Sequence, residues 1–217
     1  MPTSHALEVQ TLADLLGRLG DVAPDRVRVH PSLGAATEAD VIEVRSREKR
    51  LCELVDGVLV EKAMGFRESA LAGVILAFLR AFVIPRNLGI VLGPDGMMRL
   101  QPGLVRIPDV AYLSWNRFPD GRYPSVPLPH VAPDLAVEVL SDSNTRAEMD
   151  RKYREYFASG VHVVWEVDPR LRTVAVYLDP EDSSIHRQGD TLDGGTVLPG
   201  FALVVRDLFA ELDRERG

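Results

Sequence analysis

The sequence predicts a mixed α/β fold in which helices flank a mixed β-sheet. A strand-helix-strand succession spans residues 135–167, and shorter strand patterns precede it and follow it. The composition is that of a folded protein, because 46% of the 217 residues are hydrophobic and 26% are charged. We expect one domain over residues 51–217, preceded by an N-terminal extension of helices and loops over residues 1–50.

The composition also excludes several classes of protein. Cys52 is the only cysteine, which excludes a disulfide scaffold and a zinc module built on cysteines. The longest strongly apolar run, residues 70–79, is half of the roughly 20 residues that a membrane-spanning helix needs. The first residues lack the basic start and apolar core of a secretory signal peptide. We therefore expect a cytoplasmic protein without a membrane partner. The net charge of −7 argues against coating of nucleic acid by bulk charge, although it is compatible with a local basic groove.

Two short helices are predicted in the N-terminal extension. Apolar spacing places them at residues 11–19 and 37–44, and Thr37 with Asp40 gives the second helix the pattern of a capping box. A loop rich in arginine and valine separates them. These elements favour an extension over a separately folded domain.

The domain is predicted to begin with a hairpin and a long helix. Residues 53–61 form two short strand patterns, and Asp56-Gly57 between them suits a type I′ turn. A helix is expected over residues 66–83, before Pro85. Its apolar residues share one face: Leu71, Val74, Ile75, Phe78, Leu79 and Phe82.

Most of the remaining elements are predicted as strands. Residues 135–140 are a near-continuous apolar run, typical of a strand buried on both faces, and a helix is expected over residues 145–158. Residues 116–133 hold five prolines and predict an irregular loop. Other strands are expected at residues 89–93, 97–100, 109–114, 161–167 and 173–178, with a weak strand pair and a short helix over 208–214 in the tail.

Two acidic residues occupy positions where burial disfavours a charge. Glu138 interrupts the apolar run, and a carboxylate without a partner there would cost several kcal/mol. Asp109 begins an otherwise apolar strand after Pro108, which cannot donate to a ladder. Glu138 therefore needs a cation, a cluster of donors or a cleft at the end of its strand, and we expect Asp109 at a strand end that faces open space. The plainer interpretations are a structural ion pair for Glu138, with Lys152 as a candidate partner, and a turn-capping role for Asp109.

Two further charged residues are candidates for the same cleft. On the helix over 145–158, Lys152 lies at the border of the apolar stripe, so its stem can reach the strand of Glu138. Glu68 lies on the buried stripe of the helix over 66–83, one turn before the first apolar residue. The plainer interpretations are a solvated lysine and a first-turn carboxylate that the helix dipole stabilises.

Two carboxylates at converging strand ends with a lysine nearby predict a Mg²⁺ site for phosphodiester hydrolysis. Mg²⁺ prefers oxygen ligands, polarises a phosphoryl oxygen and lowers the pKa of a bound water. In this interpretation Asp109 and Glu138 bind Mg²⁺, or Mn²⁺ as a substitute, and Lys152 stabilises the charge that develops in the transition state.

Several blocks of the sequence resemble the Uma2 family, restriction-endonuclease-like proteins of the PD-(D/E)xK nuclease superfamily. The blocks are Pro108-Asp109, Val137-Glu138-Val139-Leu140-Ser141, Lys152 with Tyr156, and Gly160 to Pro169 with Trp165 and Asp168. The resemblance extends over about residues 53–177. It implies a restriction-endonuclease-like αβββαβ core and a DNA endonuclease. A homodimer is expected by analogy, because cutting both strands needs two sites.

The resemblance also implies roles for single residues. Asp109 would be the first acid of the motif and Glu138 the second. Leu140 stands where the superfamily usually has its lysine, and Lys152 on the next helix matches the lysine of Uma2-like proteins. Glu68 stands where many relatives have a histidine, and it suits the first-helix acid of the superfamily as a further catalytic residue.

A second Pro-Asp pair and several arginines are weaker candidates. Asp134 lies four residues before Glu138, a strand distance of roughly 13 Å that is too long for one shared metal. Five arginines surround the proposed cleft in sequence, as candidate phosphate contacts or as ordinary surface residues: Arg99, Arg106, Arg117, Arg122 and Arg146.

The sequence leaves three functions open. The first is a Mg²⁺-dependent DNA endonuclease. The second is a non-catalytic module that keeps the nuclease scaffold for DNA binding or partner assembly, and the net charge of −7 without a long basic stripe favours it. The third is an RNA or structure-specific nuclease, which the same residues would serve. The sequence lacks the Gly-x-Ser-x-Gly elbow of serine hydrolases and a Gly-rich phosphate loop.

Overall fold

The structure, a computed structural model, describes residues 10–214 of the chain. Its helices are α1 (Leu12–Arg18), α2 (Glu38–Glu43), α3 (Phe66–Val83), α4 (Arg146–Ala158) and α5 (Val205–Phe209). Its strands are β1 (Cys52–Val55), β2 (Val58–Glu61), β3 (Gly89–Leu92), β4 (Met98–Gln101), β5 (Leu104–Arg106), β6 (Val110–Ser114), β7 (Leu135–Val139), β8 (Val163–Asp168), β9 (Thr173–Tyr177), β10 (Ser183–His186), β11 (Thr191–Asp193) and β12 (Ala202–Val204). Within residues 10–214, no helix combines the length and the hydropathy needed to span a membrane.

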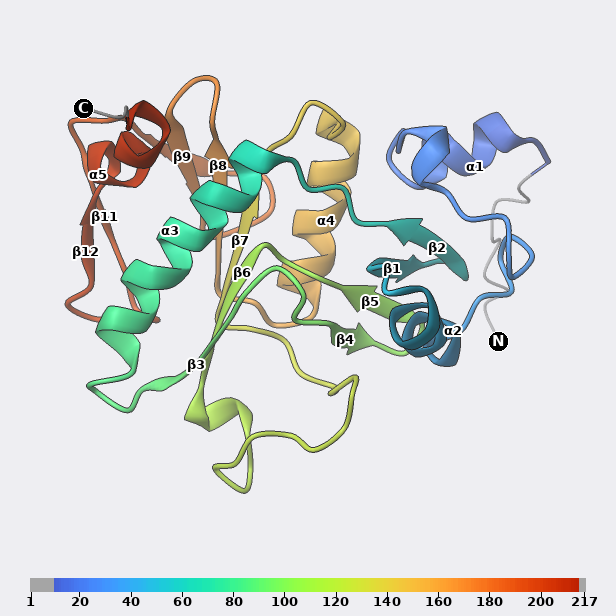
Figure 1. The fold of residues 1–217 in the computed structure, drawn as a ribbon, viewed down its shortest axis with the longest axis horizontal. Coiled ribbons are helices and arrows are strands. Elements are labelled where there is room, and N and C mark those ends of the chain that lie inside the picture. The colour runs from blue at the N-terminus through green and yellow to red at the C-terminus, as the bar shows by residue number, and fades with distance from the viewer. Residues whose placement is uncertain (1–9, 215–217) are drawn as a thin grey trace.

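The strands form a large sheet, a smaller sheet beside it, and a separate ladder (Figure 1). The large sheet has the order β10-β9-β8-β7-β6-β3, and the smaller sheet has the order β2-β1-β5-β4. Strands β7 and β8 are parallel, whereas the other neighbours in the large sheet are antiparallel. The separate ladder pairs β11 with β12. The predicted mixed α/β fold with flanking helices is therefore confirmed.

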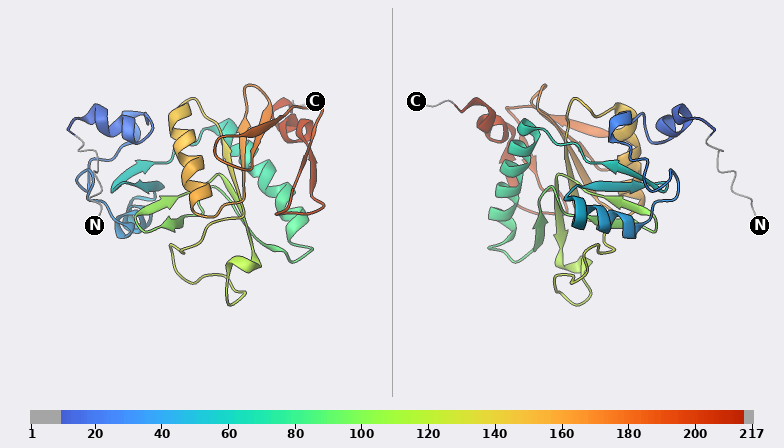
Figure 2. Two further views of the ribbon diagram at one scale, coloured as in Figure 1. Left: turned by 180° about the vertical axis from the view of Figure 1, so that it is seen from behind. Right: turned by 45° about the vertical axis from the view of Figure 1, so that its right-hand side comes forward.

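Helices α3 and α4 cover opposite faces of the large sheet (Figure 2). Leu71 and Ile75 of α3 share a hydrophobic cluster with Val137 of β7, whereas α4 packs against the other face, which includes Ala136. Successive side chains of a strand point to opposite faces, so Glu138 faces α4 as Ala136 does. This alternation directs the one acidic side chain of β7 toward the helix that carries Lys152.

Most predicted elements are found within two residues, and the differences have local causes. Strand β5 was not predicted, because it has only three residues between a turn and Pro108. Phe78 was predicted on the buried face of α3 but is 38% exposed, because the buried face is rotated toward Ala72 and Val83. The predicted tail helix begins earlier, at Val205, and ends in a 3₁₀ turn.

The N-terminal extension is attached to α4 by polar contacts. The Arg26 guanidinium donates to both carboxylate oxygens of Glu148, at 3.0 and 2.9 Å. Thr145 Oγ1, at the start of α4, donates to the Gly20 carbonyl at 2.6 Å. Gly20 has a φ of +91°, and a Cβ on it would lie 2.6 Å from Glu148 Cα, so only glycine fits this approach. The predicted division at residue 51 stays a prediction, and residues 1–9 and 215–217 lie outside the described residues.

Candidate active site

Asp109 and Glu138 lie side by side at one end of the β6–β7 ladder. Val110 of β6 pairs with Val137 of β7, so Asp109 is the next residue beyond the last pair. The Asp109 amide donates to the Val137 carbonyl at 2.9 Å, and its Oδ2 accepts from the Val139 amide at 2.7 Å. Asp109 thus contacts the neighbours of Glu138 on both sides, and both acids are buried. The fold joins two carboxylates that are 29 positions apart.

Lys152 and Tyr156 of α4 bind the carboxylate of Glu138. Lys152 Nζ lies 3.1 Å from Glu138 Oε2, and the Tyr156 hydroxyl donates to Oε1 at 2.5 Å. The connection from β7 to α4 is short, and Thr145 caps the helix by accepting from the Glu148 amide. The helix therefore returns along β7, and the inward position expected for Lys152 is found.

Glu53 on β1 is a second partner of Lys152 that the sequence analysis did not predict. Its Oε1 accepts from the Ile107 amide at 2.9 Å and lies 3.4 Å from Lys152 Nζ. Its Oε2 lies 2.6 Å from the Arg106 guanidinium, which also contacts Glu155. Arg106 was a candidate phosphate contact; its guanidinium is buried and bound by two carboxylates, and the phosphate role stays a prediction.

Lys62 is a third buried cation of the site, and it also was not predicted. It follows β2, and its Nζ lies 2.8 Å from Asp109 Oδ1. The same ammonium donates to the Ile107 carbonyl at 2.5 Å, and the side chain is 7% exposed. Lys62 thus binds Asp109 as Lys152 binds Glu138.

Six buried charged residues make up what we call the charge cluster: Glu53, Lys62, Arg106, Asp109, Glu138 and Lys152. Opposite charges alternate from Arg106 through Glu53 and Lys152 to Glu138. The alternation ends there, because the next charge is the carboxylate of Asp109, and Lys62 follows it. Asp109 and Glu138 are therefore the like charges that follow each other in this series.

The pKa shifts follow this arrangement. Burial would raise the pKa of Glu53, but the charges of Lys152 and Arg106 outweigh burial and lower it to about 2. Burial raises the pKa of Glu138 against the attraction of Lys152, and the charge of Asp109 adds to the rise. Burial also opposes the charged form of Lys152, but Glu138 and Glu53 keep its pKa above the ordinary value. The raised pKa favours the protonated ammonium of Lys152, which can donate hydrogen bonds.

The charge cluster offers donors that suit a hard divalent cation. Asp109 and Glu138 supply carboxylate oxygens, and a bound cation would offset the burial, and to a lesser extent the repulsion by Asp109, that raise the pKa of Glu138. Three of their four oxygens accept a hydrogen bond and Asp109 Oδ1 pairs with Lys62, and a carboxylate oxygen can accept a further partner. Residues 10–214 contain no group of three or more His, Cys, Asp or Glu side chains placed to hold a metal. An ion bound by this pair would therefore keep several waters, as Mg²⁺ commonly does.

The structure does not bring Glu68 into the charge cluster. Its carboxylate folds back over the start of its own helix, where Oε2 would lie 2.1 Å from a Cβ on Gly65. Gly65 is the N-cap of α3, so this position agrees with the plainer interpretation of a first-turn acid near the helix dipole.

The remaining candidates are also outside the charge cluster. Asp134 precedes β7 at the opposite end of that strand, where it accepts from Arg117 Nε at 2.8 Å and from the Ser114 amide at 2.6 Å. Arg99 lies 3.2 Å from Glu38, and Arg122 is exposed. Arg146 lies 3.0 Å from Glu166, on the strand next to β7.

Sequence patterns could have indicated Glu53 but not Lys62. Glu53 lies among apolar residues of a predicted hairpin, the same anomaly that drew attention to Glu138. Its partners come from a strand and a helix far along the chain, so the pattern alone would not have named them. Lys62 follows a strand end, where a lysine is ordinary, and only the fold shows that it is buried.

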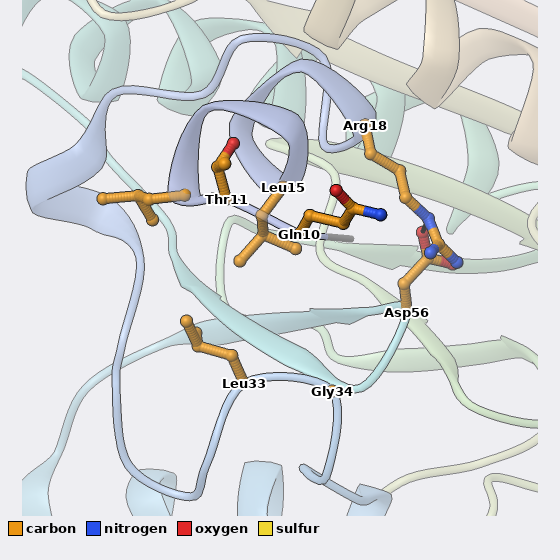
Figure 3. Close-up of a pocket in the computed structure, with 8 residues that line it drawn as sticks. Gln10, Thr11, Leu15, Arg18, Leu33, Gly34 and Asp56 are labelled. Atoms are coloured by element: carbon orange, nitrogen blue, oxygen red, sulfur yellow. Dashed lines mark hydrogen bonds and ion pairs between the residues drawn. The ribbon is translucent and has the colours of Figure 1, made fainter. Parts of the chain in front are cut away.

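A surface pocket of about 340 Å³ lies away from the charge cluster (Figure 3). It is lined by α1, by residues 33–34 and by the β1–β2 turn. In Figure 3 the Arg18 side chain reaches toward Asp56, and the two form an ion pair at 3.0 Å. The pocket shares no residue with the charge cluster, so it does not bear on the chemistry proposed for those residues.

Comparisons with known proteins identify the family and a similar fold. A family model with the description "Uma2: Putative restriction endonuclease" matches residues 39–206, which include the whole charge cluster. The fold is similar to a crystal structure of "a putative nuclease belonging to DUF820" from Anabaena variabilis ATCC 29413, with a TM-score of 0.67. That likeness covers 76% of this chain and 92% of the other, at 20% sequence identity, and concerns the fold alone. Nothing among the curated proteins matches the chain.

Proposed function

Because the chain belongs to the Uma2 family, we propose that it is a metal-dependent endonuclease that hydrolyses phosphodiester bonds in DNA. The observation that carries this proposal is that two buried carboxylates, Asp109 and Glu138, lie at the same end of the paired strands β6 and β7, with the ammonium of Lys152 bound to Glu138. We infer further that the elements α3, β3, β6, β7, α4 and β8 form the αβββαβ core of restriction-endonuclease-like proteins. The hairpin β4–β5 would then be an insertion between the first two core strands, paired with β1 in the smaller sheet.

In the proposed reaction, Asp109 and Glu138 would hold Mg²⁺, or Mn²⁺ in its place. When bound, the ion would polarise a phosphoryl oxygen and lower the pKa of a water. Lys152 would donate hydrogen bonds to the oxygens where negative charge develops, since its pKa keeps it protonated. Glu53 would position Lys152, and the Tyr156 hydroxyl would orient Glu138. DNA as the substrate is part of the proposal, RNA is an alternative substrate, and a homodimer stays a prediction.

Isosteric substitutions test the proposal. Asp109→Asn and Glu138→Gln keep the side-chain shape and remove the charge that would bind the metal. We expect each to slow metal-dependent nicking of supercoiled plasmid by about a hundredfold or more. Asp134→Asn is the matched control, because Asp134 is a buried acid after a proline at the other end of β7. Nicking should persist in the control.

The result that contradicts the proposal is equally specific. Nicking at the wild-type rate by folded Asp109→Asn and Glu138→Gln variants would show that another site, or a contaminant, cuts the plasmid. Circular dichroism spectra and melting temperatures would establish that the variants are folded. Mn²⁺ titration by calorimetry adds a readout without substrate, and we expect binding by the wild type and by Asp134→Asn only.

One observation favours a second function, a non-catalytic module on the nuclease scaffold. All six members of the charge cluster are ion-paired within the protein, which is also the arrangement of a purely structural network. A module of this kind would bind DNA or assemble with a protein partner. A non-catalytic module predicts no cleavage with any divalent metal and no heat of Mn²⁺ binding. The endonuclease predicts metal-dependent cleavage and a measurable heat of Mn²⁺ binding.

A further inference from the structure

Lysine is rare in this chain, and its distribution is uneven. The 25 basic residues are 22 arginines and three lysines. Two of the three, Lys62 and Lys152, belong to the charge cluster, and the third, Lys49, is exposed and donates to the Ser46 carbonyl. A chain that uses arginine at almost every other basic position has lysine at both places that border the acid pair. This choice needs an explanation specific to the ammonium group.

Neutralising a buried carboxylate does not explain the lysines. Other buried carboxylates of this chain are paired with arginine: Glu148 with Arg26, and Glu53 with Arg106. A guanidinium can form two parallel hydrogen bonds to one carboxylate, so arginine would neutralise Asp109 at least as well. What lysine adds is a compact charge with three donors that can point in different directions.

The contacts of Lys62 leave one of those donors available. Its ammonium donates to the Ile107 carbonyl at 2.5 Å and forms an ion pair with Asp109 Oδ1 at 2.8 Å, so two partners face a group that has three N–H donors. Lys152 binds Glu138 on the other side of the acid pair. Two ammonium groups therefore flank the two carboxylates, one beside each acid.

The chain that follows Lys62 is exposed. It leads from β2 in the smaller sheet to α3 on the large sheet (Figure 1). Residues 63, 65 and 67 are exposed, and Phe66 at the start of α3 is 92% exposed. Lys62 therefore stands at the boundary between the buried charge cluster and an exposed segment of the chain.

We propose that Lys62 is a second functional lysine, whose remaining N–H binds a non-bridging oxygen of the phosphodiester held at Asp109 and Glu138. This inference rests on the proposed endonuclease function and deepens it. Lys62 is then a substrate-binding residue on the Asp109 side, and Lys152 has the corresponding position on the Glu138 side.

The test compares DNA binding and nicking in matched variants. Binding of a short fluorescein-labelled DNA duplex in Ca²⁺ is followed by anisotropy at several salt concentrations. If Lys62 contacts a phosphate, Lys62→Met lowers the slope of log K against log salt by about 0.9, the value for one contact to a duplex. Lys49→Met removes the same charge from an exposed position and should leave the slope unchanged.

A second variant keeps the test decisive if Lys62→Met does not fold. Lys62→Arg retains the charge beside Asp109, so we expect it to fold. We expect its nicking rate to fall about tenfold or more. The N–H groups of a guanidinium lie in one plane, so they cannot point toward Asp109, the Ile107 carbonyl and a phosphate oxygen as those of an ammonium can. A purely structural Lys62 would leave that rate unchanged.

The outcomes separate this inference from the proposed function. A wild-type slope in folded Lys62→Met, or wild-type nicking by Lys62→Arg, overturns the role of Lys62 and leaves the endonuclease intact. Absence of binding and nicking by the wild type in Mg²⁺, Mn²⁺ and Ca²⁺ overturns the endonuclease, and the role of Lys62 with it.

Discussion

The ammonium of Lys152 lies 3.1 Å from the carboxylate of Glu138, and each side chain is only 6% exposed. Two opposite charges removed from water at this distance stabilise each other, but each becomes costly when the other is lost. The pair therefore contributes to folding as well as to the proposed chemistry. A loss of activity after substitution of Lys152 is informative only when the stability of the variant is known.

A double-mutant cycle measures how strongly Lys152 and Glu138 depend on each other. Lys152→Met leaves Glu138 and Glu53 as buried carboxylates without this partner, so we expect a loss of about 3–5 kcal/mol in the free energy of unfolding. Adding Glu138→Gln removes one of the two charges and should restore part of that loss. Urea denaturation provides the four values, and strictly additive effects would contradict a direct interaction.

Substitution of Glu53 should separate the scaffold from the chemistry. Glu53→Gln removes a charge that both Lys152 and Arg106 contact, so we expect it to lower the free energy of unfolding by about 3–5 kcal/mol. The matched control is Glu48→Gln, which removes the exposed partner of a pair with the half-buried Arg28 and should cost less than about 1 kcal/mol. Equal losses in the two variants, measured by urea denaturation, would argue against this role of Glu53.

The same variant has a pH signature. Folding lowers the pKa of Glu53 from 4.5 to about 2, so its ionised form stabilises the folded protein above pH 4.5. This contribution disappears as the pH falls from 4.5 toward 2, because the carboxylate becomes protonated. We therefore expect the stability difference between the wild type and Glu53→Gln to shrink over that interval. Melting temperatures of the two proteins measured between pH 4.5 and 2 would show this decrease. A stability difference that stays constant over this interval would contradict the lowered pKa of Glu53.

Local patterns were sufficient to predict the elements that position Asp109, Glu138 and Lys152. A charge in a buried strand and a lysine at the border of an apolar stripe indicate positions that need partners, and the structure brings these three residues together. Glu68 is different, since its carboxylate lies over Gly65 at the start of its own helix. Whether the three act as proposed stays a prediction.

Pairing between distant segments could not be read from local patterns. The smaller sheet depends on a contact between β1 and β5, in which Leu54 pairs with Val105, and β5 has too few residues to show an alternation. This sheet brings Glu53 and Arg106 to the charge cluster, and it places Lys62 beside Asp109. Glu53 and Lys62 were not predicted because their positions in the site depend on this smaller sheet, whose pairing of β1 with β5 was not predicted either.

The contact between Arg26 and Glu148 predicts that the N-terminal extension contributes to the stability of the domain. Both side chains are largely buried, and the guanidinium donates to both carboxylate oxygens. We expect Arg26→Met to cost about 3–5 kcal/mol in the free energy of unfolding, since it leaves a buried carboxylate without this cation. Arg47→Met, in an exposed pair with Glu43, is the control and should cost less than about 0.5 kcal/mol.

Cys52 provides a test of the hairpin that carries Glu53. It is the next residue along β1, it is buried, and burial raises the pKa of its thiol to about 11. Because the thiolate is the reactive form, we expect almost no reaction with a disulfide reagent at pH 8 in the folded protein. In urea the thiol should titrate near its ordinary pKa of 9.0 and react completely. Glu53→Gln should speed the reaction under native conditions by making opening of the strand more frequent. Rapid reaction of the wild-type thiol would contradict the buried position of β1 and, with it, the position of Glu53 beside Lys152.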